Sequence, residues 1–257
     1  MPNLEGKTAI VTGSSRGIGR AIAARLASEG ARVVLCARSA DTLKQAVQEI
    51  GTGHAASIAL DLREPEACQQ LVDFAVKTFG SIHILVNNAG ATRRGLFVNL
   101  SDEDWTDSFA LKFFGAVRIT RAAWPHLKQA AGSVVFISGA GGRTPGAEFA
   151  AGGAVNAALL SLTKALAESG IRDGVQVNCV NPGTVRTDRL KVRLSTMMKE
   201  EGINLAAAEH KFVESCRVTR IGEPEDIAAL VAFVAGPEGR FLHGSLIDMD
   251  GGATKTV

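Results

Sequence analysis

Three glycines and two arginines near the amino terminus have the types and spacing of a site for a phosphate-bearing ligand. The segment TGSSRGIG places Gly13, Gly17 and Gly19 between an apolar run and an Ala-rich amphipathic stretch. Glycines at a strand-to-helix turn let the backbone approach a pyrophosphate closely, and the helix N-terminus favours its negative charge. The pattern predicts a dinucleotide site, although a purely structural turn can carry the same glycines.

The residues after the second expected strand indicate which dinucleotide binds. An acidic residue about twenty positions after the glycines would bind the ribose hydroxyls of NAD. Here the segment LCARSAD carries Arg38 and has no carboxylate before Asp41. Arg38 and Arg16 would hold a 2′-phosphate through charge-assisted hydrogen bonds. NADP(H) is therefore predicted in preference to NAD(H); the alternative is that both arginines are solvated surface residues.

The elements that must position these residues alternate along the chain. Short, β-branched apolar runs separate helical periods, and the runs are TAIVTG, ARVVLCA, HAASIALD, SIHILVNNAG, GSVVFISG, GVQVNCVNPG and GSLIDMDGG. Nearly all-apolar strands separated by helices are typical of a parallel sheet covered on both faces. We therefore expect one domain over residues 1–257, an α/β, doubly wound, Rossmann-like fold with a seven-stranded parallel sheet and helices on both faces.

The segment 185–218 interrupts this strand–helix alternation. It is helix-prone and follows the sixth expected strand, at whose carboxyl end ligands of open α/β sheets bind. We interpret it as a lid over the substrate; the alternative is a peripheral helical pair without a ligand role.

Composition excludes several classes of function. The net charge of +2 gives no support for a nucleic-acid or acidic-membrane partner. The apolar runs are strand-length, and the amino terminus lacks a signal-peptide pattern, so we expect a cytoplasmic protein with no membrane partner. The four cysteines, scattered without a CxxC pair, are expected to be reduced, and no histidine has metal-ligand spacing.

Several motifs together resemble the classical short-chain dehydrogenase/reductase family over nearly the whole chain. They are TGSSRGIG, the pair Asp61-Leu62, NNAG at 87–90, NPG at 181–183 and DMDGG at 248–252. The resemblance implies a nicotinamide cofactor and a homo-oligomer, a dimer or tetramer. It also implies cofactor contacts by Gly13, Ser15, Arg16, Gly17, Ile18, Gly19, Arg38, Asp61, Leu62, Asn88, Ala89, Gly90, Pro182, Gly183, Val185 and Thr187.

The resemblance also identifies catalytic positions, and these depart from the family pattern. The family uses a serine, a tyrosine and a lysine, commonly with an asparagine. The corresponding positions here are Gly139, Gly152, Asn156 and Lys112, and the chain contains no tyrosine at all. Ser138 precedes the serine position, so its hydroxyl should face away unless a bulge intervenes.

The lysine and asparagine positions are therefore exchanged. We interpret Lys112 as a cation kept near the nicotinamide ribose, where a lowered pKa would suit a proton donor. The alternative is that Lys112 is helix surface. Glu148 and His210 are weaker candidates for the donor. Gly152 and Gly153 are expected to leave open space for water or a bulkier substrate.

Three functions remain open from the sequence. The first is an NADP(H)-dependent oxidoreductase with a rearranged active site, acting on a small carbonyl or alcohol substrate. The second is an inactive NADP(H)-binding protein used for sensing or assembly. The third is an enzyme of altered reaction type, such as a dehydratase or a reductase of activated double bonds.

Overall fold

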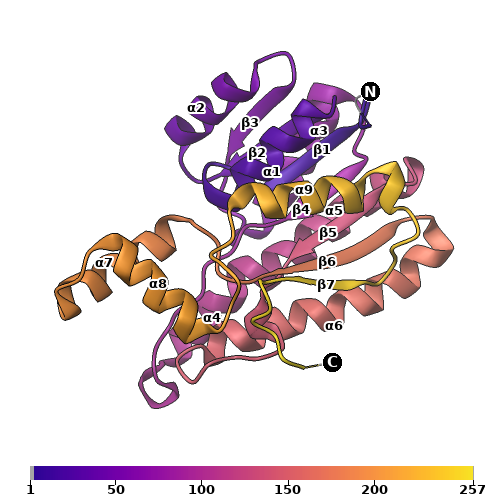
Figure 1. The fold of residues 1–257 in the computed structure, drawn as a ribbon. Helices are drawn as coiled ribbons and strands as arrows, with labels where there is room; N and C mark the ends of the chain where they lie inside the picture. Colours follow the sequence, from indigo (N-terminus) through magenta and orange to yellow (C-terminus); the bar gives the residue numbers. More distant parts are fainter. Residues whose placement is uncertain (1–2, 257) are drawn as a thin grey trace.

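The computed structural model describes residues 3–256 and contains a seven-stranded parallel sheet in the order β3-β2-β1-β4-β5-β6-β7 (Figure 1). The strands are β1 (Thr8–Thr12), β2 (Arg32–Ala37), β3 (Ala55–Ala59), β4 (Ile84–Asn87), β5 (Ser133–Ile137), β6 (Gln176–Pro182) and β7 (Leu246–Met249). Every residue of β1, β4, β5 and β6 is buried, as expected for strands covered on both faces. The doubly wound α/β fold predicted from the sequence is confirmed.

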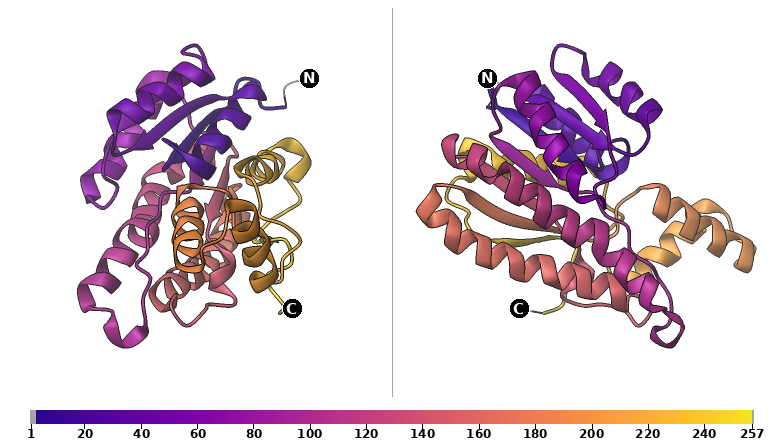
Figure 2. Two further views of the ribbon diagram at one scale, coloured as in Figure 1. Left: turned by 60° about the vertical axis from the view of Figure 1, so that its left-hand side comes forward. Right: turned by 180° about the vertical axis from the view of Figure 1, so that it is seen from behind.

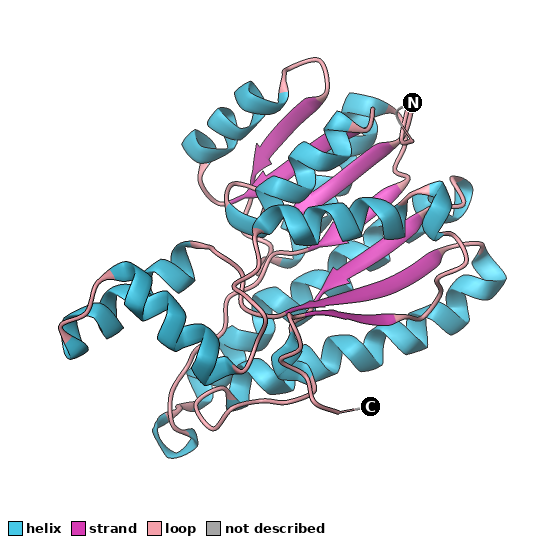
Figure 3. Ribbon diagram, viewed as in Figure 1, coloured by secondary structure: helices cyan, strands magenta, loops and turns pink. Residues whose placement is uncertain are grey.

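Helices cover both faces of the sheet, which gives two separate cores (Figures 1 and 3). One core is made with α1 (Gly17–Ser28), α2 (Ala40–Ile50) and α9 (Pro224–Ala235). The other is made with α3 (Pro65–Phe79), α5 (Ala116–Gln129) and α6 (Ala150–Asp173). The strand order reverses between β1 and β4, and ligands of such sheets bind outside the carboxyl ends of the strands at that point.

Helix α6, with 24 residues, is long and apolar. By length and composition alone, it is long and apolar enough to cross a membrane. The helix nevertheless packs along β6 and contributes Val155 and Leu159 to the buried residues, so it serves as a sheet-covering helix.

The helix before β5 is not uniform. Helix α4 (Asp102–Phe109) begins at a Ser101–Asp104 capping box and continues into a π-helical segment, Ala110–Gly115, before α5 starts. Short π-helical segments within α-helices are frequently found at functional sites. Here the segment contains Lys112. The sequence predicted a helix at this place but gave no signal of the π-helical turn.

Helices α7 (Asp188–Glu201) and α8 (Leu205–Cys216) project from the carboxyl ends of the strands (Figures 1 and 2). They enclose a small core of their own, in which Leu190, Leu194, Ala208 and Phe212 are buried. The two ends of this segment lie side by side, since Val185 and Gly222 form a parallel bridge.

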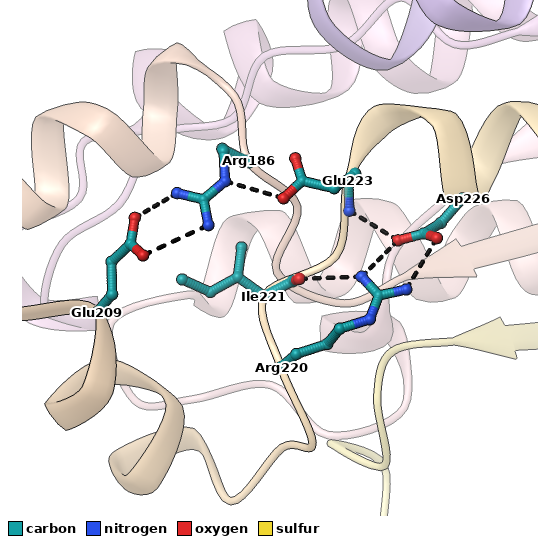
Figure 4. Close-up of polar contacts among 6 residues, drawn as sticks. All are labelled: Arg186, Glu209, Arg220, Ile221, Glu223 and Asp226. Atoms are coloured by element: carbon teal, nitrogen blue, oxygen red, sulfur yellow. Dashed lines mark hydrogen bonds and ion pairs between the residues drawn. The ribbon is translucent and has the colours of Figure 1, made fainter. Parts of the chain in front are cut away.

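Arg186 joins the base of this segment to the body of the fold (Figure 4). Its guanidinium donates to Glu209 on α8 and, at 2.9 Å, to Oε1 of Glu223 at the start of α9. Beside it, Arg220 binds both carboxylate oxygens of Asp226, at 2.6 and 2.8 Å, and lowers the pKa of that carboxyl. These ion pairs hold the two ends of the segment to the start of α9.

Arg186→Gln should loosen α7 and α8 without unfolding the sheet, because it removes two ion pairs at their base. Amide hydrogen exchange over 188–216 should accelerate by about fivefold, as expected for losing roughly 1 kcal/mol. Arg25→Gln, which breaks the Arg25–Glu29 pair on α1, is the matched control. Equal exchange rates in both variants would show that Arg186 does not anchor the segment.

Candidate active site

Asn88 holds the glycine loop by hydrogen bonds, at the place where the strand order reverses between β1 and β4. Its Nδ2 donates to the carbonyl oxygens of Thr12, at 2.9 Å, and Gly13, at 3.1 Å. The Thr12 hydroxyl in turn accepts from the backbone N–H groups of Asn88 and Ala89, both at 3.0 Å. A Cβ at Gly19 would lie 2.4 Å from Asn88 Nδ2, so only glycine allows this approach. In the structure, the Asn88 side chain positions the loop.

The start of α1 is arranged to bind an anion. Arg16 occupies the N-cap without a side-chain capping bond, which leaves the first N–H groups of the helix available. Gly17 has a positive φ of 54°, and a Cβ there would lie 3.3 Å from the Thr187 methyl group. Two predicted cofactor-binding residues, Gly17 and Thr187, are thus brought together from distant parts of the sequence.

The two arginines expected to share a 2′-phosphate lie in different surroundings. Arg16 faces Asp188 at the start of α7, with 3.4 Å between Nη1 and Oδ2, and both side chains are exposed. Arg38 is exposed after β2 and contributes, after the hydrogen-bonded Arg63, to lowering the pKa of Asp61. The Asp61 carboxylate itself binds Arg63, with 2.6 Å between Oδ2 and Nη2.

The remaining predicted cofactor positions surround the same edge of the sheet. Leu62 is buried after β3, and Pro182 ends β6. Gly183 packs tightly on the Asp250 backbone, so that a Cβ added at Gly183 would lie only 2.6 Å from Asp250 Cα. The partly exposed Ser15 and Ile18 flank the start of α1.

Lys112 points inward from the π-helical segment. Its Nζ donates to the Ser138 carbonyl oxygen at 2.7 Å, and its stem crosses Gly90, where a Cβ would lie 2.8 Å from Lys112 Cδ. Burial, followed by the charge of Arg189, lowers the pKa of Lys112 to about 8. An amine with this pKa can exchange a proton near neutral pH.

Ser138 links Lys112 to Asn156. While its carbonyl accepts from Lys112, its hydroxyl donates to the Asn156 carbonyl oxygen at 3.0 Å and is buried. The hydroxyl therefore points into α6. The Asn156 side chain lies against Gly139, where a Cβ would be 3.0 Å from Nδ2, and its buried Oδ1 has no protein partner. The structure thus gathers the three candidate residues into one connected cluster.

Phe149 occupies the space beside Gly152. A Cβ at Gly152 would lie 2.2 Å from Cε2 and 2.3 Å from Cζ of the Phe149 ring. Pro145 fills the corresponding space at Gly153, since a Cβ added to Gly153 would lie 2.6 Å from the Pro145 Cβ. The expectation that these glycines leave open space is therefore wrong, because neighbouring loop residues fill it. The sequence carried no signal of this, since Phe149 and Pro145 lie in a loop without periodicity.

The two weaker proton-donor candidates lie in different places. Glu148 is exposed beside Phe149, and its carbonyl accepts from Gly95 N–H at 3.0 Å. His210 is exposed on α8, with its Nδ1 3.5 Å from Glu214 Oε2. Arg189, which no sequence motif indicated, reaches the site by donating to the Gly90 carbonyl oxygen at 2.6 Å.

The substitution Gly152→Ala tests whether the space beside Gly152 is filled by the Phe149 ring or open. Gly152→Ala should lower the free energy of unfolding by about 1–3 kcal/mol, because the new Cβ overlaps the Phe149 ring. In a Phe149→Ala background the same change should stabilise by up to about 1 kcal/mol, the helix preference of alanine over glycine. Urea denaturation of the four proteins measures both effects. An equal effect in the two backgrounds would contradict the packing described here.

Comparisons with known proteins identify the family. The short chain dehydrogenase family model matches residues 7–197. A 3-oxoacyl-[acyl-carrier-protein] reductase of Vibrio cholerae is 33% identical over 251 residues, covering 97% of this chain and 98% of that protein. L-Sorbose reductase of Gluconobacter frateurii, solved with NADPH and L-sorbose, has a TM-score of 0.95 at 30% identity, with 100% of both chains covered. A Burkholderia cenocepacia short chain dehydrogenase solved with NADP has a TM-score of 0.85 at 36% identity, covering 98% of this chain and 99% of the other. The chain belongs to the short chain dehydrogenase family.

Proposed function

We propose that this chain is an NADP(H)-dependent oxidoreductase with a rearranged active site, acting on a small carbonyl or alcohol substrate. The observation that carries the proposal is the inward-pointing Lys112, held at the Ser138 carbonyl beside the NNAG turn. Named oxidoreductases among the relatives support an enzymatic role.

The residues present fit an NADP(H) molecule. The glycine loop is a cradle in which a Cβ at Gly13 would lie 2.9 Å from Ala89 Cα, and the uncapped start of α1 favours a pyrophosphate. Arg38 would hold the 2′-phosphate, and the absence of a carboxylate before Asp41 disfavours NAD(H). When bound, the nicotinamide accepts or donates the hydride. The NADPH and NADP complexes of the structural relatives support this choice.

Lys112 is the candidate for handling the proton. Partial burial lowers its pKa, and its single hydrogen bond to Ser138 leaves further N–H groups to meet a substrate oxygen. In this proposal the Ser138 carbonyl orients the ammonium, while Asn156 supports Ser138 from the other side. Ser138 and Asn156 then act as positioning residues.

Residues 185–218 serve as the substrate lid in this proposal. Thr187 touches the glycine loop and Arg189 touches Gly90, so the start of α7 borders the site. Substrate binding and product release would then involve motion of α7 and α8 about the Arg186 anchor.

A homo-oligomer, dimer or tetramer, completes the proposal. The face around α4 carries exposed apolar side chains, including Phe97, at 65% exposed, and Phe114, at 47%. Apolar surface of this kind suits contact with a second copy.

One observation favours the second candidate function, an inactive NADP(H)-binding protein. The Ser138 hydroxyl is bound to Asn156, and a phenyl ring without a hydroxyl fills the space at Gly152. In that case the cofactor would bind but the chain would not turn over any substrate.

The cofactor preference can be measured directly by titrating the protein with NADPH and NADH and following nicotinamide fluorescence. NADPH should bind at least tenfold more tightly, and Arg38→Ala should remove about tenfold of NADPH affinity while sparing NADH. Lys44→Ala, an exposed change on the adjacent helix, is the control. Equal binding of the two cofactors by the parent chain would refute the assignment to NADP(H).

The proton-donor role predicts a pH dependence. Carbonyl reduction requires the protonated amine, and the pKa of Lys112 is about 8. The rate, measured as kcat/KM, should therefore be constant below that pH and fall as the pH rises through it. Lys112→Met should reduce kcat by 10²–10⁴-fold, roughly the contribution of a general acid, with NADPH affinity retained. If kcat/KM of the Lys112→Arg variant still fell over the same pH range, the titrating group would be one other than Lys112.

A further inference from the structure

Four cations from three separate segments lie close to one another around Gly90. Arg189 on α7 donates to the Gly90 carbonyl oxygen, and the stem of Lys112, from the π-helical segment, packs beside the Cα of Gly90. Arg193 lies four residues after Arg189, on the same face of α7. Arg94 follows Gly90 on the loop after β4.

Aromatic rings hold two of these arginines in place. The Arg94 guanidinium lies 4.4 Å from the centre of the Phe149 ring, the ring that fills the space at Gly152. The Arg193 guanidinium lies 4.8 Å from the centre of the Phe212 ring, which is buried on α8. A guanidinium stacked on an aromatic face keeps its N–H edge free for hydrogen bonds, which suits the recognition of a planar anion.

Within residues 3–256 none of the four forms an ion pair, whereas Arg16 and Arg186 close by do. Burial and then the charge of Arg193 lower the pKa of Arg94, with Arg189 adding to this and Glu148 opposing it. Arginines that repel one another in this way create a field that attracts negative ligands.

Resting on the oxidoreductase function proposed above, we infer that the substrate is anionic and that its carboxylate or phosphate binds to Arg94 and Arg193. Arg189 is less available, because one of its nitrogens is bound to the Gly90 carbonyl. With the anionic group at Arg94 and Arg193, the reacting carbonyl would lie toward Lys112. The aromatic stacks of Phe149 and Phe212 then determine specificity by fixing the arginines.

The test compares matched pairs of compounds that differ in charge. Dihydroxyacetone phosphate is paired with dihydroxyacetone, and 4-carboxybenzaldehyde with benzaldehyde. Each is titrated by calorimetry into the chain saturated with NADP⁺, where a carbonyl cannot be reduced. The anion of at least one pair should bind about tenfold or more tightly than its neutral partner, as for charge-assisted hydrogen bonds to arginine. The two pairs distinguish phosphate from carboxylate.

Arg94→Gln combined with Arg193→Gln should reduce the preference for the anion to less than about twofold. NADP⁺ affinity and binding of the neutral partner should stay unchanged. Arg121→Gln, an exposed arginine on α5, is the control and should keep the full preference. A preference that survives in the double variant, or no preference in the parent chain for either anion, would overturn the inference.

Failure of the anion-binding inference can be distinguished from failure of the proposed oxidoreductase function. If NADP⁺ does not bind, the cofactor assignment fails, and the same titrations on the chain alone still decide whether Arg94 and Arg193 bind anions. If the cofactor and the anions bind but no carbonyl is reduced with NADPH, the chain is an anion-binding member of the family without turnover. A loss of NADP⁺ affinity in the double variant would instead place these arginines at the cofactor and would overturn the inference.

Discussion

The hydrogen bond from the Lys112 ammonium to the Ser138 carbonyl is the interaction on which the candidate site depends. A charged amine can be kept away from bulk water only where strong acceptors replace the lost hydration. Three local features accompany this bond: Lys112 lies in the π-helical segment, Gly90 leaves room for its stem, and the Ser138 hydroxyl donates to Asn156 while its carbonyl accepts from the ammonium. Changing any one of them alters the position or the pKa of the amine.

The departures from the family pattern are coupled to one another. Gly139 has a φ of 151°, a backbone conformation that residues with side chains rarely adopt, and a Cβ there would lie 3.0 Å from the Asn156 amide nitrogen. Gly152 and Gly153 are in contact with Phe149 and Pro145. A serine at Gly139 would therefore adopt a strained backbone conformation, and a tyrosine at Gly152 would overlap the Phe149 ring. Such packing indicates an alternative, internally consistent arrangement, since an interior that had merely lost its side chains would contain cavities.

The sequence predicted the fold well because sheet and helix periodicity are local properties. Buried runs such as TAIVT and the glycine turn after them specify β1, the loop and α1 almost to the residue. The cluster of Lys112, Ser138 and Asn156 was found through motif spacing, although its hydrogen bonds were not. Phe149 beside Gly152, Arg189 at Gly90 and the π-helical turn were all missed, because each depends on side-chain packing or on a backbone irregularity that residue types alone do not specify. No periodic pattern encodes such contacts.

The crowding of cations around Gly90 connects ligand binding to the chemistry of Lys112. Arg189 helps to lower the pKa of the amine, so a negative group that neutralises this field must raise that pKa again. By linkage, an anion that favours the protonated amine is itself bound more tightly when the amine is protonated. An anionic substrate would therefore charge the group that is proposed to donate the proton to it, whereas a neutral substrate would leave the amine partly deprotonated near pH 8. The same arginines that select the charge of the substrate would thus set the protonation state of the donor.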